Sequence, residues 1–113
     1  MSLLTLRALG AFAVTIQATT VTAFPTDKIR ALLIYLALEN DLPQHRERLA
    51  ALFWPEIDQT LALNNLRVTL HRLRETLEKV QPGLGATLIE STRQTIRLLP
   101  TLITTDVASF RRF

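Results

Sequence analysis

The chain has 113 residues, of which 48% are hydrophobic, so it is long and apolar enough to form one domain with a modest core. Thirteen basic residues against ten acidic residues give a formal net charge of only +3, and eleven of the basic residues are arginine, the side chain suited to phosphate and base contacts. This small charge argues against non-specific coating of nucleic acid and fits a domain with one basic face.

Several classes of protein are disfavoured by what the sequence lacks. The chain contains no cysteine, which excludes disulfides, thiolate zinc sites and a cysteine nucleophile, and which fits the cytoplasmic localisation that we expect. No apolar run approaches the roughly 20 residues that span a bilayer, and Arg7 interrupts the apolar N-terminus, so we expect neither a membrane segment nor a signal peptide. There is no nucleophile-elbow pattern, glycine-rich phosphate loop or metal-spaced ligand set, so we expect no enzyme, cofactor or metal.

The N-terminal part of the sequence predicts a small sheet and then a helix. Apolar and polar residues alternate over 4–8 and 12–17, which predicts two short strands, and the Thr- and Val-rich residues 19–23 are compatible with a third. Few charges lie here, so we expect this sheet to cover the core. Thr26 is the predicted N-cap of a helix that runs to about Glu39. Its predicted buried stripe consists of Ile29, Leu32, Leu33, Leu36 and Ala37.

Two further helices and a hairpin are predicted in the rest of the chain. A second helix covers about 46–53 and ends before Trp54-Pro55, and a third, long helix begins at Asp58 or Thr60. A turn at residues 81–85 separates the long helix from two β-rich runs, which predict a hairpin with Arg93 near its tip. The apolar residues of the second helix are Leu49, Leu52 and Phe53, and the two β-rich runs are 87–91 and 95–99.

The most informative segment is 64–80, NNLRVTLHRLRETLEKV. Four leucines recur at helical spacing and line one face, namely Leu66, Leu70, Leu73 and Leu77. A second stripe with the same spacing lies on another face of the helix. It consists of Asn64, Arg67, His71 and Arg74, with Arg72 close beside them. Asn and Arg are the side chains that read base edges bidentately in a major groove, so this face is a candidate for DNA recognition. The alternative interpretation is an ordinary surface helix with a solvated basic face.

The order of a sheet, three helices and a hairpin predicts an α+β fold, a winged helix-turn-helix with an N-terminal antiparallel sheet and a C-terminal β-hairpin wing. In this interpretation residues 61–79 form a recognition helix in the major groove of double-stranded DNA, and residues 87–99 form a wing at the minor groove or backbone. The predicted DNA-binding residues are Asn64, Arg67, Thr69, His71, Arg72, Arg74, Arg93 and Thr95.

Four motifs, in this order along the chain, carry a resemblance to a known family. They are the opening strand Leu4–Gly10 with Phe12, residues 24–28 leading into 30–37, residues 46–52 leading to Trp54-Pro55, and residues 64–67 with 70–74. Together they resemble the N-terminal DNA-binding domain of the Streptomyces antibiotic regulatory proteins, or AfsR-like bacterial transcriptional activators. The DNA-binding domain of that family is similar to the OmpR/PhoB winged helix.

The resemblance implies a sequence-specific activator that binds direct repeats in promoter DNA and recruits RNA polymerase. Arg72 and Arg74 match the Arg-Leu-Arg of the OmpR-type recognition helix, and residues 92–95 match the place of the wing arginine. It also implies that residues 1–103 form the DNA-binding domain and that 104–113 begin a following helical activation domain. Residues 104–113 contain two signals for the start of a helix. They are a candidate N-cap at Thr105-Asp106 and an apolar stripe of Val107, Phe110 and Phe113.

Some interpretations stay open at the level of sequence. His71 either contacts DNA or is merely solvated, and Arg46 and Arg48 either touch phosphates or flank a helix cap. Trp54 is better explained as an aromatic packed on the core than as a base-stacking residue. For the whole chain, the alternative is a protein-interaction module whose basic helix docks an acidic partner, such as an RNA polymerase subunit. We expect the free fragment to be a monomer.

Overall fold

The computed structural model describes residues 4–7, 13–16, 19–20, 24–99 and 103–105. In chain order its elements are β1 (Leu4–Arg7), β2 (Ala13–Ile16), β3 (Thr19–Thr20), α1 (Asp27–Leu38), β4 (Gln44–His45), α2 (Arg46–Phe53), α3 (Gln59–Val80), α4 (Leu84–Leu88), β5 (Ile89–Ser91), β6 (Thr95–Leu98) and β7 (Ile103–Thr105). The predicted stripe of Val107, Phe110 and Phe113 lies outside the described residues, as do residues 21–23 of the predicted third strand.

The strands form two sheets. In the first, with the order β3-β2-β1-β7, β1 and β2 are antiparallel as predicted, and β7 pairs with β1 in parallel. Strand β7 places Thr105, the expected cap of a new helix, opposite Leu6. The domain boundary expected at residue 103 stays a prediction. The second sheet is antiparallel with the order β4-β6-β5. Its β4 strand comes from the segment between α1 and α2.

Helix α1 forms where the local signals predict it. Thr26 adopts an extended backbone, and its Oγ1 accepts a hydrogen bond of 3.2 Å from the amide of Ile29, which satisfies one of the free donors of the first turn. The acidic Asp27 lies in the first turn, where the helix dipole favours a negative charge. All five residues of the predicted apolar stripe are buried. This helix therefore contributes a continuous apolar face to the core.

The predicted bounds of α2 are confirmed, but its predicted apolar face is partly wrong. Leu49 is buried and Phe53 packs at the edge of the core, whereas Leu52 is 52% exposed and Ala50 is buried in its place. Each residue turns an α-helix by about 100°, so a helix that packs through Leu49, Ala50 and Phe53 carries Leu52 out of the interface. Of the adjacent apolar residues Leu52 and Phe53, only Phe53 therefore packs against the core.

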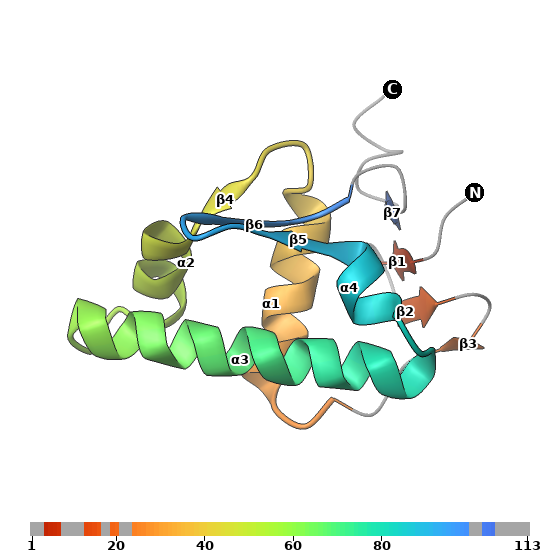
Figure 1. Ribbon diagram of the computed structural model, residues 1–113, viewed down its shortest axis with the longest axis horizontal. Coiled ribbons are helices and arrows are strands. Elements are labelled where there is room, and N and C mark those ends of the chain that lie inside the picture. Colours follow the sequence, from red (N-terminus) through yellow and green to blue (C-terminus); the bar gives the residue numbers. More distant parts are fainter. Residues whose placement is uncertain (1–3, 8–12, 17–18, 21–23, 100–102, 106–113) are drawn as a thin grey trace.

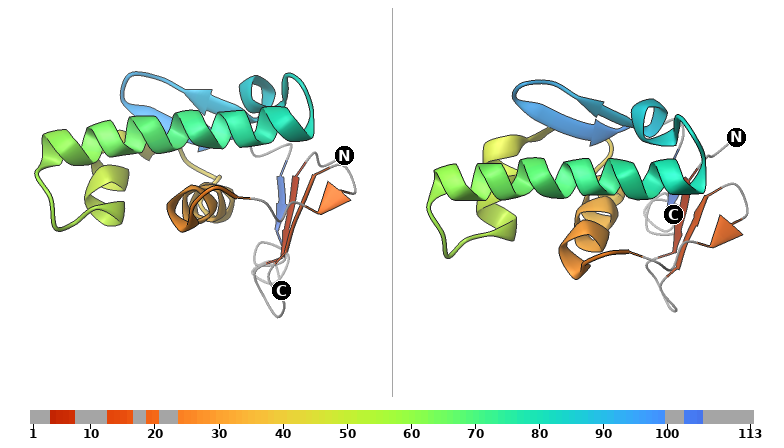
Figure 2. Two further views of the ribbon diagram at one scale, coloured as in Figure 1. Left: turned by 90° about the horizontal axis from the view of Figure 1, so that it is seen from below. Right: turned by 60° about the horizontal axis from the view of Figure 1, so that its bottom comes forward.

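Helix α3 begins at the predicted cap, because the carboxylate of Asp58 accepts a 3.1 Å hydrogen bond from the amide of Thr60. All four leucines of its predicted stripe are buried. Figure 1 shows this helix running along the longest dimension of the molecule, with α2 near one end and the β1–β2 sheet near the other. In Figure 2 the hairpin of β5 and β6 follows one side of α3, while α1 and α2 lie on the other side.

The segment after α3 corrects the predicted strand at residues 87–91. A short helix, α4, occupies residues 84–88, and only 89–91 are in strand β5. Gly83 has a φ of 85°, a conformation that favours glycine, and the Glu78 carboxylate accepts hydrogen bonds from the amides of Gly83 (2.7 Å) and Gly85 (2.9 Å). Glu78 of α3 therefore holds the turn in place. The helix that follows the turn, α4, buries Leu84 and Leu88, which lie one turn apart on the same face.

Truncating Leu73 on α3 is expected to lower the free energy of unfolding by about 2–5 kcal/mol. Leu73 is fully buried, so Leu73→Ala leaves a cavity in the hydrophobic core, and urea denaturation followed by circular dichroism measures the loss. The matched control is Leu61→Ala on the same helix, because Leu61 is 58% exposed and its truncation should change stability by less than about 0.5 kcal/mol. Equal losses in both variants would contradict this packing.

Candidate nucleic-acid interface

The burial of the leucine stripe determines which side chains α3 presents to solvent. Asn64, Arg67, His71 and Arg72 are exposed, and His71 retains 73% of its side-chain surface. At about 100° per residue, Asn64 and His71 lie near the centre of the outer face, and Arg67 lies toward one edge. The outward placement expected for these four residues is therefore present in the structure. Their contact with DNA stays a prediction.

Arg72 and Arg74 are two positions apart in the sequence, so they lie about 200° apart around the helix and on opposite edges of its outer face. Arg74 is half-buried, and its Nη2 donates a 2.6 Å hydrogen bond to Oγ of Ser91 on β5. Arg74 thus lies on the edge that faces the hairpin, whereas Arg72 lies on the far edge. The sequence placed these two arginines side by side, and the structure assigns them to different surroundings.

Charge changes sign along the outer face of α3. Its first part carries Asn64, Arg67 and Arg72, and its second part carries Glu75 and Glu78 with Lys79 at the end. His71 stands at the boundary, with its Nε2 3.3 Å from Oε1 of Glu75, an ion pair when the imidazole is protonated. Carboxylates are repelled by a phosphate backbone, so within the predicted recognition helix 61–79 the cationic surface is limited to residues 61–72. Which of these residues contact DNA stays a prediction.

Two polar side chains near the start of this outer face are joined to each other. Nη2 of Arg67 donates a 2.9 Å hydrogen bond to Oδ1 of Asn64, one helical turn away, and both side chains are exposed. The bond limits the rotamers of both residues, and it involves neither the Asn64 amide nitrogen nor the other guanidinium nitrogens of Arg67. Such a pair presents several hydrogen-bond donors in a restrained arrangement.

The two threonines among the predicted DNA-binding residues are less exposed than the arginines Arg67, Arg72 and Arg93. Thr69 is only 9% exposed, so its side chain faces the interior of the fold and is not accessible to a ligand. Thr95 is half-buried, and its Oγ1 lies 3.0 Å from Oγ1 of Thr92 across the hairpin turn. Neither hydroxyl is therefore presented as the exposed arginines are.

The hairpin turn is organised by Thr92. Its amide donates to the carbonyl of Thr95 at 2.8 Å, and its Oγ1 accepts hydrogen bonds from the amides of Gln94 (3.1 Å) and Thr95 (2.9 Å). These local bonds are the side-chain-to-backbone type that favours Thr at turns. They leave Arg93 exposed at the tip, where the sequence predicted it. The tip is thus a well-defined turn that carries a guanidinium.

A recess of about 520 Å³ lies between the hairpin tip, the start of α2 and the first part of α3. Its lining residues are His45, Arg46, Glu47, Arg48, Leu63, Arg93 and Gln94. Three arginines and one glutamate make it a cationic surface, and its members come from segments almost fifty residues apart. Sequence reasoning identified Arg46 and Arg48 only as possible phosphate contacts, because no local pattern shows that Arg93 adjoins them.

Arg46 is the half-buried arginine of the recess. Its partial burial lowers the pKa of its guanidinium, and the nearby positive charge of Arg74 lowers this pKa further. Arginine remains protonated under any ordinary condition despite such a shift. The effect therefore reports that two cations, one from α2 and one from α3, are held close together beneath the hairpin.

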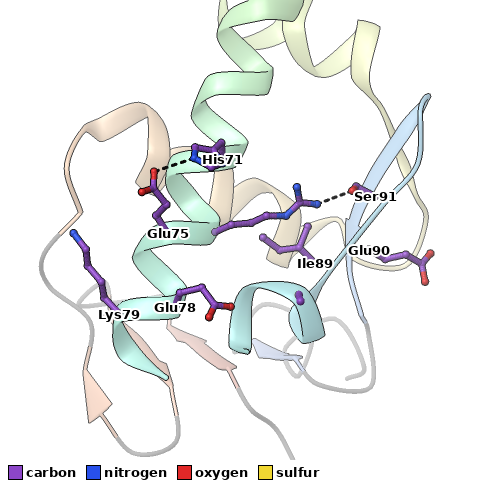
Figure 3. Close-up of a pocket in the computed structure, with 9 residues that line it drawn as sticks. His71, Glu75, Glu78, Lys79, Ile89, Glu90 and Ser91 are labelled. Carbon is purple, nitrogen blue, oxygen red and sulfur yellow. Dashed lines mark hydrogen bonds and ion pairs between the residues drawn. The ribbon is translucent and has the colours of Figure 1, made fainter. Parts of the chain in front are cut away.

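A second, larger hollow of about 830 Å³ lies between the later part of α3, α4 and β5. Figure 3 shows His71, Glu75, Glu78 and Lys79 along the helix and Ile89, Glu90 and Ser91 on the facing strand. Most of these charged groups have partners, since Glu75 pairs with His71, Glu78 holds the α4 turn, and Glu90 pairs with Arg97 at 3.1 Å. The hollow has a mixed charge and does not form a cationic surface.

Trp54 packs against the core, as the sequence favoured, and does not present a free ring for stacking. The Nζ of Lys28 lies 5.2 Å from the centre of the Trp54 ring and donates a hydrogen bond to the carbonyl of Phe53. This contact joins the start of α1 to the end of α2. Trp54 therefore helps to hold the end of α2 against the start of α1.

No family model matches the sequence, and no curated protein matches it. Among solved structures the chain is similar to Mycobacterium tuberculosis EmbR in complex with a low affinity phosphopeptide, with a TM-score of 0.69 and 23% sequence identity. The similarity covers 91% of this chain, whereas the chain spans 27% of the EmbR chain. The shared fold is an α+β fold that is consistent with a winged helix.

Two further features are absent from the residues that the structure describes. No helix within them combines the length and apolar character needed to cross a membrane. In the same residues, no group of three or more His, Cys, Asp or Glu side chains is placed to hold a metal ion.

Replacing Thr92 with valine is expected to loosen the hairpin tip without unfolding the hairpin. Thr92→Val keeps the side-chain shape but removes the oxygen that accepts from Gln94 and Thr95, so the hydrogen-exchange protection of the Thr95 amide should fall by about tenfold. The internal control is the amide of Leu99, which bonds to the carbonyl of Leu88 at 3.0 Å and should keep its protection. Unchanged protection of Thr95 would show that the turn does not depend on this hydroxyl.

Proposed function

We propose that this chain binds double-stranded DNA sequence-specifically as the DNA-binding domain of a bacterial transcription regulator that works in the cytoplasm. The observation that carries the proposal is that the cationic recess with Arg93 at the hairpin tip extends to Leu63, the residue of α3 just before the exposed Asn64–Arg67 pair. A winged helix uses a helix and a hairpin in this arrangement to engage adjacent grooves of one duplex. The chain's resemblance to AfsR-like activators supports the same assignment.

In the proposed complex, residues 61–72 of α3 enter the major groove. The restrained Asn64–Arg67 pair reads base edges, because Asn pairs with adenine and Arg with guanine through two hydrogen bonds each. Arg72 lies on the other edge of the helix, next to one of the two phosphate backbones that border the groove. The acidic later part of α3 remains outside the groove.

The hairpin acts as the wing. Its tip extends Arg93 toward the minor groove or its phosphates, and the cationic recess at the start of α2 adjoins the same backbone. Binding of this kind combines sequence reading by α3 with positioning contacts from α2 and the hairpin. The resemblance further supports binding to direct repeats and recruitment of RNA polymerase by an activator.

The decisive experiment is selection of bound sites from a random pool of duplexes, followed by titration of the selected site. The proposal expects one preferred sequence, and a log–log slope of affinity against salt of about −3 to −5 for a protomer that neutralises roughly 3–5 phosphates. Enrichment of no sequence would contradict specific binding. Binding to an acidic peptide as strong as binding to DNA would favour the protein-interaction alternative.

On the selected site, Arg67→Ala and Arg72→Ala are each expected to weaken binding by about 1–3 kcal/mol. Loss of a base-reading arginine relaxes the preference at one base pair, whereas loss of a phosphate contact weakens all sequences alike. The control is Lys79→Ala, which removes one positive charge from the same helix beyond its acidic part and should change affinity little. A folded Arg67→Ala, Arg72→Ala double variant that binds undiminished would refute the assignment of α3.

Arg93→Ala is expected to reduce affinity most on sites whose wing-side flank is rich in A·T pairs. Such sequences narrow the minor groove and deepen its negative potential, which favours an inserted guanidinium. Affinities of the wild-type chain and the variant for the selected core with A·T-rich and G·C-rich flanks measure the effect. Equal losses on both flanks would instead identify a plain phosphate contact.

A further inference from the structure

Arg46 differs from Arg48 and Arg93, the other arginines of the recess, because its Nε and its backbone amide both bond to the hairpin turn. Its side-chain Nε donates a 2.9 Å hydrogen bond to the carbonyl of Thr92, and its backbone amide donates a 2.8 Å hydrogen bond to the carbonyl of Gln94. The two acceptors lie on either side of Arg93. The first residue of α2 therefore holds the hairpin tip at two points, forty-six residues away in the chain.

The shape of the tip and its location have different causes. The bonds of Thr92 to Gln94 and Thr95 are local, so they define the turn wherever the hairpin lies. The location relative to α2 depends on β4, which contributes only Gln44 and His45 to the sheet, and on the two bonds of Arg46. A two-residue strand is a weak anchor by itself, so the side-chain bond of Arg46 carries a large share of the attachment.

Arg74 attaches the same hairpin to α3 through Ser91, the last residue of β5 before the turn. The two guanidiniums are close enough for Arg74 to depress the pKa of Arg46, so their repulsion has to be offset by the acceptors that each one reaches. Both arginines are thus committed to the hairpin. The exposed Arg48 and Arg93 share the recess with Arg46 but, among the described residues, no hydrogen bond joins Arg48 to the hairpin.

We infer that Arg46 is a positioning residue, which fixes the hairpin tip over the start of α2 and thereby sets where Arg93 meets the DNA relative to Asn64 and Arg67. It acts through the carbonyl of Thr92 and not as a phosphate contact of its own. The DNA part of this inference rests on the proposed function, whereas the attachment of the tip is a property of the free chain.

The first test needs no DNA and uses the whole 113-residue chain. The amide of residue 46 is at the first position of α2, where it has no partner within the helix, so its hydrogen-exchange protection reports directly on its bond to the Gln94 carbonyl. Arg46→Met has similar length and no donor, and it should lower this protection by about tenfold. Unchanged protection overturns the inference.

Arg46→Gln separates the hydrogen bond from the charge. The amide nitrogen of glutamine occupies the same position along the side chain as Nε of arginine, so Gln can still donate to Thr92 while the positive charge is lost. We expect Arg46→Gln to keep the protection of the residue-46 amide within about twofold of the wild type. Equal loss of protection in the Gln and Met variants would show that the charge matters and would overturn the positioning role. If Arg46→Met does not fold, Arg46→Ala takes its place.

The second test is a double-mutant cycle on the selected DNA site. If Arg46 acts through the tip, Arg46→Met and Arg93→Ala should each cost a similar factor, roughly tenfold, and the double variant should bind within about twofold of Arg93→Ala. Arg48→Met is the matched control, because it removes a charge from the same recess, and its loss should add to that of Arg93→Ala. Additive losses for Arg46 as well would overturn the inference. Failure of the wild-type chain to bind any duplex would refute the proposed function, and the exchange experiment would still decide the attachment.

Discussion

Burial of the leucine stripe on α3 is the constraint on which the rest of this structure depends. Leu66, Leu70, Leu73 and Leu77 are each no more than 2% exposed, so the helix has one rotation about its axis in which all four can be buried. A rotation by a single residue, about 100°, would carry a polar side chain into the core. The positions of Asn64, Arg67 and Arg72 on the surface therefore follow from apolar packing and not from interactions of their own.

The same packing creates the support for the hairpin. Its inward-facing Ile89, Ile96 and Leu98 are buried against the helices, which a two- or three-stranded ribbon needs in order to be stable in water. Two arginines, one from α2 and one from α3, then bond to the neighbouring residues Thr92 and Ser91 at its turn end. The arginines of this region thus fall into two groups: some are exposed and able to bind a ligand, and others are engaged in holding the surface that presents them.

Local signals predicted much of the fold because their physical causes are local. The caps at Thr26 and Asp58 act within one helical turn, and the stripes of α1 and α3 reflect spacing along one helix. Prediction was wrong where the cause was distant. Leu52 matched an apolar pattern but lies outside the contact that α2 makes with the rest of the core. Helix α4 depends on Glu78 reaching the amides of Gly83 and Gly85, which β-propensity at 87–91 does not reveal.

For the candidate site, the sequence by itself determined the α+β order of elements, the identity of α3, its exposed Asn64, Arg67, His71 and Arg72, and the position of Arg93 at a hairpin tip. Only the tertiary structure decided that Thr69 is buried, that Arg72 and Arg74 lie on opposite edges of α3, and that Arg46 and Arg74 are bonded to the hairpin. The reason is physical. Helical period and turn chemistry are encoded over a few neighbouring residues, whereas the partner of a guanidinium is set by the packing of segments that are distant in sequence.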